Sequence, residues 1–165
     1  MSSHWRLDGV IPMKREIVLN PVQQEAANSL LARLAASPVT VLSGQAGVGK
    51  TTILKVLQTT QGGVYLGAQQ LMHTRVEQGP AAIEEAFFRM IEDAIQSHNL
   101  LLVDDVNLVT GAIVAEGRGR IHLLDAALTA ILAEARILDR RIVFAVEAEI
   151  PWPIQRRAQI VQVAN

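Results

Sequence analysis

The sequence contains no cysteine, which excludes disulfide bonds and metal sites built from thiolates. Its four histidines, His4, His73, His98 and His122, lack the spacing of metal ligands, so we expect structural or surface roles for them. No apolar run is long enough to span a membrane, and the N-terminus lacks the basic stretch and apolar core of a signal peptide. These absences favour a cytoplasmic protein without a membrane span.

A strong charge of either sign is also missing. The formal net charge is −1, which gives no support for nucleic acid or an acidic membrane surface as the main partner. Half of the residues (50%) are hydrophobic, so a chain of 165 residues can bury a core. We expect one domain over residues 1–165, with an N-terminal arm at residues 1–20.

The segment from Gly44 to Thr51 matches the phosphate-loop pattern G-x-x-x-x-G-K-[ST]. Its glycines let the backbone curl with N–H groups pointing inward, where they and the following helix N-terminus can hold a phosphate. Lys50 is expected to reach the β- and γ-phosphates, and the Thr51 hydroxyl to bind Mg²⁺. The predicted nucleotide-binding residues are Gly44, Gln45, Ala46, Gly47, Val48, Gly49, Lys50, Thr51 and Thr52.

The residues around this loop supply the context that the motif requires. Residues 39–43 are mainly β-branched and apolar, as in a buried parallel strand. Ile53, Leu54 and Leu57 follow the loop at helical spacing. The sequence therefore predicts a strand, a phosphate loop and a helix in direct succession.

The remaining chain alternates predicted strands and helices. Asn20 and Pro21 form a helix start, and the face of Val22, Ala26, Leu30 and Leu34 continues to about residue 36. Further strands are predicted at 63–66, 100–103, 142–146 and 159–163, helices at 80–97 and 121–138, and a loop at 110–120. In helix 80–97 we expect Glu84 to face water. This alternation predicts an α/β fold with a parallel sheet, helices on both faces, and ligands beyond the carboxyl ends of the strands.

Acidic residues follow two of the predicted strands. Asp104 comes directly after the apolar strand 100–103, where a carboxylate can hold Mg²⁺ directly or through water. Asp105 is the candidate to polarise an attacking water, and a turn-capping role is the alternative. Glu147 follows the strand 142–146 and should lie at the same edge of the sheet.

Taken together, residues 20–163 resemble the AAA+ branch of the P-loop ATPases. Residues 44–51 are similar to its Walker A motif and residues 100–105 to its Walker B motif. The resemblance implies a three-layer sandwich with the strand order 5-1-4-3-2, ATP and Mg²⁺ as cofactors, and assembly into rings or helices. It also places Glu147 at the family's sensor position, and Arg156 and Arg157 where the family has arginines that reach a neighbour's nucleotide.

A trans arginine would neutralise charge on the γ-phosphate and couple hydrolysis to assembly. We expect Arg157 to take this role before Arg156, with surface salt bridges as the alternative for both. Arg118 and Arg120 could serve a similar interface or hold an anionic partner, but an ordinary surface role is favoured for them.

Several features depart from the family pattern. Asp105 stands where Glu is usual, so we expect slow hydrolysis. Glu147 replaces a neutral polar residue and could either repel the nucleotide or act as a base. The family's helical lid is expected to be absent, because two residues follow Val163. Residues 67–78 lack an aromatic-aliphatic-glycine paddle, so threading of a protein through a pore is not expected.

The leading hypothesis is an ATP-binding, slowly hydrolysing domain that works as an assembly-coupled switch. It would bind ATP or ADP and form a homo-oligomer, or a hetero-oligomer with another ATPase subunit. One alternative is a hydrolysis-deficient scaffold or regulatory subunit. Another is a DNA-directed initiator or loader, which the Asp-Asp pair favours and the charge total does not. Residues 19–24 also resemble the glutamine motif of helicases, but the chain is too short for a second motor domain.

Overall fold

The computed structural model describes residues 16–77, 79 and 82–165, so arm residues 1–15 and residues 80–81 of the predicted helix lie outside it. Within these residues, five strands form one parallel sheet: β1 (Val39–Ser43), β2 (Val64–Leu66), β3 (Leu100–Val103), β4 (Arg141–Val146) and β5 (Gln159–Gln162). The order β2-β3-β4-β1-β5 confirms the predicted arrangement.

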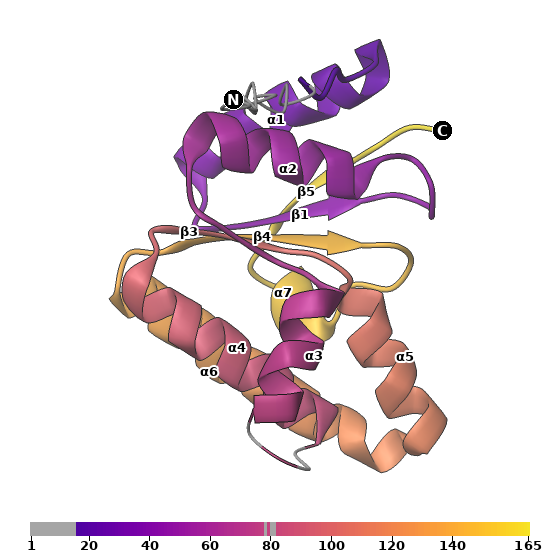
Figure 1. Ribbon diagram of the computed structural model, residues 1–165, viewed down its shortest axis with the longest axis vertical. Coiled ribbons are helices and arrows are strands. Elements are labelled where there is room, and N and C mark those ends of the chain that lie inside the picture. The colour runs from indigo at the N-terminus through magenta and orange to yellow at the C-terminus, as the bar shows by residue number, and fades with distance from the viewer. Residues whose placement is uncertain (1–15, 78, 80–81) are drawn as a thin grey trace, which may run out of the picture.

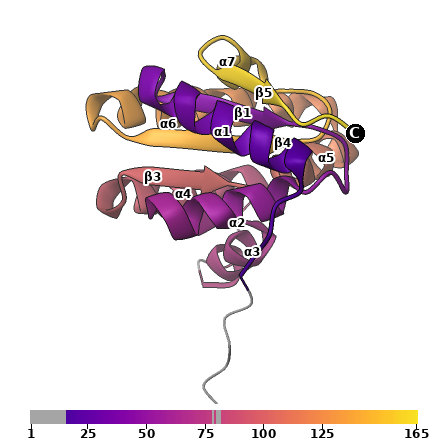
Figure 2. The same ribbon diagram turned by 90° about the horizontal axis from the view of Figure 1, so that it is seen from above.

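Helices cover both faces of the sheet, which confirms the three-layer sandwich (Figure 1). One face carries α1 (Pro21–Ala36) and α2 (Lys50–Gln61), which lie next to each other in both views (Figure 2). The other face carries α3 (Ala68–Glu77), α4 (Ile83–Ser97), α5 (Val106–Glu116), α6 (Ile121–Ile137) and the short α7 (Trp152–Gln155). Among the described helices, none combines the length and apolar character needed to cross a membrane.

Strand β4 shows how the sequence builds the two cores. Ile142, Phe144 and Val146 are buried with the helices α3 to α7, whereas Val143 and Ala145 are buried with α1 and α2. Successive side chains of a strand point to opposite faces, so a strand covered on both faces is expected to be mainly apolar. This explains the apolar runs of β3 and of residues 142–146 in β4, whereas β1 includes the buried Thr40.

Helix α1 begins as predicted. The Asn20 side chain accepts a hydrogen bond from the Gln23 N–H (2.9 Å), and Gln23 Oε1 accepts one from the Asn20 N–H (3.1 Å). This capping box satisfies two backbone donors at the helix start, and Pro21 occupies the first helical position. The predicted buried face is confirmed at Ala26, Leu30 and Leu34, but Val22 is 40% exposed.

The prediction of a loop at residues 110–120 was wrong. Residues 106–116 form α5, and a 3₁₀ turn at Arg118–Arg120 connects it to α6. Val106, Val109 and Ile113 are buried at helical spacing, and this packing outweighs the helix-weakening glycine at position 111. Gly117, with φ of 121°, ends the helix. Helix α3 was not predicted either.

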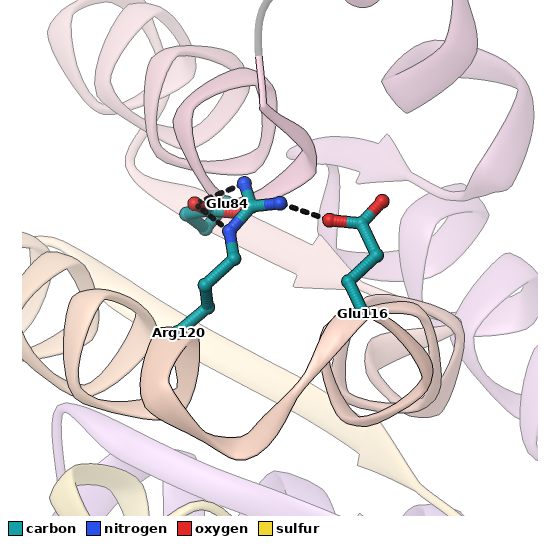
Figure 3. A network of polar contacts seen from close by, with 3 residues as sticks. All are labelled: Glu84, Glu116 and Arg120. Carbon is teal, nitrogen blue, oxygen red and sulfur yellow. Dashed lines mark hydrogen bonds and ion pairs between the residues drawn. The ribbon is translucent and has the colours of Figure 1, made fainter.

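Glu84 was expected to face water, but it is buried in the first turn of α4, with 6% of its surface exposed. Its Oε1 accepts hydrogen bonds from Nε (3.1 Å) and Nη2 (2.5 Å) of Arg120, which also pairs with Glu116 at the end of α5 (Figure 3). The hydrogen bond with Glu84 raises the pKa of Arg120. Arg120 therefore ties together α4, α5 and the start of α6 within its own chain.

Candidate nucleotide-binding site

The predicted phosphate loop connects β1 to α2 at the carboxyl edge of the sheet. Gly47 and Gly49 have φ angles of 85° and 95°, a left-handed backbone that favours glycine. At Gly49 a side chain would also meet a neighbour, since a Cβ there would lie 2.2 Å from Gln23 Nε2. The shape of the loop therefore depends on glycine at both positions.

Lys50 is the first residue of α2, and its side chain turns back over the loop. The Nζ donates hydrogen bonds to the carbonyl oxygens of Gly44 (2.6 Å) and Gln45 (2.7 Å). Lys50 is only 8% exposed, so its charge is held close to the loop backbone. This ammonium and the N-terminus of α2 place positive charge at the loop, which favours an anion there.

Asp104 and Thr51, which are 53 positions apart, meet beside the loop. Thr51 Oγ1 donates to Asp104 Oδ2 at 2.5 Å, and the Asp105 N–H donates to Oδ1 at 2.9 Å. Hydroxyl and carboxylate oxygens are ligands that Mg²⁺ accepts in nucleotide sites, where phosphates and waters complete the coordination. The Thr51 hydroxyl and the Asp104 carboxylate, which lie beside the loop, are a donor set that fits Mg²⁺ held together with a phosphate. No group of three or more His, Asp or Glu side chains that could hold a metal ion occurs among the described residues.

Asp105 adopts a left-handed backbone, with φ of 56°, at the point where the chain enters α5. Its Oδ2 accepts a hydrogen bond from the Ala68 N–H (3.1 Å) at the start of α3. The carboxylate thus joins the end of β3 to the segment after β2. This contact is with the start of α3 and not with the turn that contains Asp105, where its side chain makes no capping hydrogen bond to α5. The role of Asp105 toward a water stays a prediction.

Tyr65 is a site residue that the sequence analysis missed. Its hydroxyl donates to Asp104 Oδ2 at 2.8 Å, the same oxygen that Thr51 contacts. Burial, followed by the hydrogen bond to Asp104 and the charges of Asp104 and Asp105, raises the pKa of Tyr65 above its usual range. The available signal was a lone hydroxyl side chain in β2, the strand that the predicted order places beside β3.

Gln23 lies in the segment that resembles the glutamine motif, and both ends of its side-chain amide are occupied. Oε1 belongs to the capping box of α1, and Nε2 donates to the carbonyl oxygen of Val48 at 3.2 Å. The start of α1 is therefore attached to the phosphate loop.

Glu147 directly follows β4, which lies between β1 and β3, so it shares the sheet edge with the loop and Asp104. Its side chain is exposed and lines a cavity of about 550 Å³ between α5, the start of α6 and the segment before α7. Trp152 and Ile150 line the same cavity. Position at the edge is thus established, while a contact with nucleotide stays a prediction.

Arg157 lies at the opposite edge. It lines a cavity with Pro38 and Val39, where β1 begins, and its Nη1 donates to the carbonyl oxygen of Pro153 at 3.1 Å. The length of β1 separates this position from the loop of the same chain by roughly 15 Å. Because of this distance, any contact of Arg157 with a nucleotide requires another chain. The guanidinium of Arg156 lies 5.6 Å from the centroid of the exposed Trp152 ring.

No protein-family model and no curated protein sequence match the chain. Solved structures do match. AMPPCP-bound DnaA from Aquifex aeolicus is 18% identical, with 88% of this chain and 48% of that chain covered and a TM-score of 0.56. Domain III of Thermotoga maritima DnaA is 17% identical, with 89% and 64% covered and a TM-score of 0.58.

A third match is DnaA bound to AMPPCP and single-stranded DNA, at 19% identity, 90% and 48% coverage and a TM-score of 0.55. The chain thus spans about half the length of two of these proteins. Identities this low carry information on the fold alone. The strand order, the helical layers and these matches together show that the chain has the α/β fold of an AAA+ P-loop ATPase core.

Proposed function

We propose that this chain binds ATP together with Mg²⁺ at the carboxyl edge of its sheet and hydrolyses it slowly. The observation that carries the proposal is the pair formed by Thr51 and Asp104, at 2.5 Å, beside a loop that holds the Lys50 ammonium. These groups come from the end of β3 and the start of α2. Their convergence supplies, in one place, the donors that a phosphate requires and the oxygens that magnesium requires.

Each group has a role that follows from its chemistry. The loop N–H groups and Lys50 would bind the phosphates, with Lys50 exchanging its contacts to Gly44 and Gln45 for phosphate oxygens. Thr51 and Asp104 would hold Mg²⁺, which neutralises phosphate charge when bound. ADP would use the same groups except those that contact the γ-phosphate.

We expect hydrolysis to be slow because of the two residues that could polarise the attacking water, Asp105 and Glu147. Asp105 is one methylene shorter than the glutamate usual in the family it resembles, and its Oδ2 already accepts the Ala68 N–H. To act on a water, Asp105 must lose or share this contact. Glu147, at the same edge, is the second candidate for the base, or it repels the γ-phosphate.

We further propose that nucleotide controls assembly, as a homo-oligomer or with another ATPase subunit. Arg157 is exposed and lies at the sheet edge opposite the loop, so it would serve a neighbour's site rather than its own. Arg156, also exposed, is the second candidate. A guanidinium supplied in trans would stabilise charge on the γ-phosphate only within the assembly.

Phosphate release by the wild-type protein, compared with Lys50→Ala, tests the enzymatic part. The wild type is expected to release phosphate slowly and in a Mg²⁺-dependent manner, and the variant to fall to background. Identical release from both proteins would remove the enzymatic proposal.

Two alternatives have support from specific observations. The Asp105 contact with Ala68 favours a hydrolysis-deficient scaffold or regulatory subunit, which would bind ATP stoichiometrically without any release of phosphate. The structural similarity to DnaA, in one case bound to single-stranded DNA, favours an initiator- or loader-type domain. Anisotropy of labelled single- and double-stranded oligonucleotides at low salt tests the latter, and no binding with or without ATP would exclude it.

A further inference from the structure

The Asp104 carboxylate accepts hydrogen bonds both from β2 and from the helix that follows the phosphate loop. Its Oδ2 accepts hydrogen bonds from Thr51 Oγ1 (2.5 Å) and from the Tyr65 hydroxyl (2.8 Å). Tyr65 belongs to β2, which pairs with β3 and so fixes the position of Tyr65 relative to Asp104 at the end of β3. Two hydroxyl groups from different elements therefore meet at one carboxylate oxygen.

The aromatic ring of Tyr65 is also fixed from its sides. The Lys55 ammonium lies 5.5 Å from the ring centroid. On the Gly67 side there is no space for a side chain, because a Cβ at Gly67 would lie 2.9 Å from ring carbon Cε1 and from the hydroxyl oxygen of Tyr65. The ring packs against the core beneath α1 and α2. Its hydroxyl is thus directed at Asp104 by packing on several sides.

The two hydroxyls are expected to differ in whether they bind the metal themselves. Thr51 is expected to turn an oxygen lone pair toward Mg²⁺, whereas Tyr65 belongs to no part of the phosphate-loop motif. We propose that Tyr65 is a positioning residue: its hydroxyl keeps the Asp104 carboxylate oriented for Mg²⁺ and so sets the affinity of the site for the metal. This inference rests on the proposed function and names a residue that the motifs do not contain.

Tyr65→Phe removes the hydroxyl and retains the ring, and the test is the Mg²⁺ dependence of nucleotide binding. A fluorescent ATP analogue is titrated in EDTA and then at increasing Mg²⁺ concentrations. Mutation of the hydrogen-bond partners of metal ligands commonly changes metal affinity about 10- to 100-fold. The Mg²⁺ concentration that gives half of the Mg²⁺-induced increase in affinity for the ATP analogue should therefore rise about tenfold or more. Affinity in EDTA should stay within about twofold of the wild type, because Tyr65 acts on the metal through Asp104.

Thr59→Val is the matched control, since it removes a hydroxyl from α2 whose one hydrogen bond within the described residues is to the Lys55 carbonyl oxygen. It should leave the Mg²⁺ dependence unchanged. The proposal is overturned if Tyr65→Phe has the Mg²⁺ dependence of the control. Equal weakening in EDTA and in Mg²⁺ would also overturn it, because it would show a general packing role.

A second measurement needs no variant. Tyr65 is the single tyrosine of the chain, so protein labelled with ¹³C at the tyrosine ring carbon that bears the hydroxyl gives one NMR signal. This signal should move when Mg²⁺ is added to the ATP-bound protein in place of EDTA. A signal that does not move on Mg²⁺ addition would contradict the proposal even if Tyr65→Phe failed to fold.

The titration distinguishes a loss of nucleotide binding from a loss of the Tyr65 role alone. A wild-type protein that binds the ATP analogue in neither condition overturns the proposed function and with it the role of Tyr65. A wild type that binds with a clear Mg²⁺ dependence, unchanged in Tyr65→Phe, overturns the role of Tyr65 alone.

Discussion

Among the described residues, three donors form hydrogen bonds to the Asp104 carboxylate, and one of them belongs to the phosphate-loop motif. Thr51 is that donor, whereas Tyr65 reaches Asp104 from β2 and the third is the N–H of the neighbouring Asp105. At the scale of single residues, a motif thus identifies the candidate ligand-binding atoms. The groups that orient those atoms come from packing, which motifs do not record.

Gly49 and Gly47 provide a matched pair of substitutions at this scale. Both have left-handed φ angles, so alanine at either position should cost about 1–2 kcal/mol of stability through backbone strain. Among the described residues, no atom lies within 4 Å of a Cβ at Gly47, whereas a Cβ at Gly49 meets the Gln23 amide. Gly49→Ala should therefore cost about 1 kcal/mol more, through the lost hydrogen bond to Val48. Denaturant unfolding measures both, and an equal or smaller loss for Gly49→Ala would contradict the described contact.

The raised pKa of Tyr65 predicts a loss of stability in alkali. Above the ordinary tyrosine pKa of about 10, the unfolded chain loses the phenol proton while the metal-free folded protein retains it. Stability from this group is thus complete below about pH 10 and declines as the pH rises toward the folded-state pKa. Unfolding measured between neutral and alkaline pH should show a shallower decline in Tyr65→Phe, and identical slopes would disagree with the burial of the hydroxyl.

At the scale of elements, the contact between Arg120 and Glu84 fixes the start of α6 against α4. Removal of the guanidinium leaves a buried carboxylate without its cation, whereas Arg89 and Glu85 on the same helix form an exposed pair. Arg120→Met should lower the thermal unfolding midpoint by several degrees and Arg89→Met should have little effect. Addition of Glu84→Gln to Arg120→Met should restore part of the loss. Equal midpoints for the two single variants would show that the buried contact contributes nothing.

Elements were predictable where one local pattern decided them. Strand β3 and residues 142–146 of β4 are apolar because both faces of the sheet are covered, and the phosphate loop has a fixed spacing. Helix α5 was missed because the glycines and arginines of residues 110–120 suggested a loop, and its buried face becomes evident only when it packs on the sheet. The burial of Glu84 could not be predicted, since its partner Arg120 is 36 positions away.

At the scale of the whole molecule, the predicted functional groups lie at two edges of the sheet. The loop, Asp104 and Glu147 are at the carboxyl edge, and Arg157 is at the amino edge. A chain that uses both edges at one nucleotide must assemble with another copy or with a related subunit. The positions of these groups therefore predict assembly that depends on ATP and on Arg157.

Arg157→Ala should abolish any ATP-dependent increase in molecular mass, as measured by sedimentation with and without ATP. Binding of ATP to the single chain should be unaffected, because Arg157 cannot reach its own loop. Arg136 lines the same cavity and provides the control, so Arg136→Ala should assemble as the wild type does. If Arg157→Ala assembles normally with ATP, the trans-arginine proposal is wrong.

The central claim is that the phosphate loop and Asp104 together bind a nucleoside triphosphate with magnesium. Calorimetry of the folded protein with ATP and Mg²⁺ tests it most directly. We predict one binding site per chain and an affinity about 10- to 100-fold weaker in Lys50→Ala, the loss expected for charged hydrogen bonds to phosphate. No heat of binding from any nucleoside triphosphate, in a sample whose circular dichroism shows a folded α/β protein, would contradict the account.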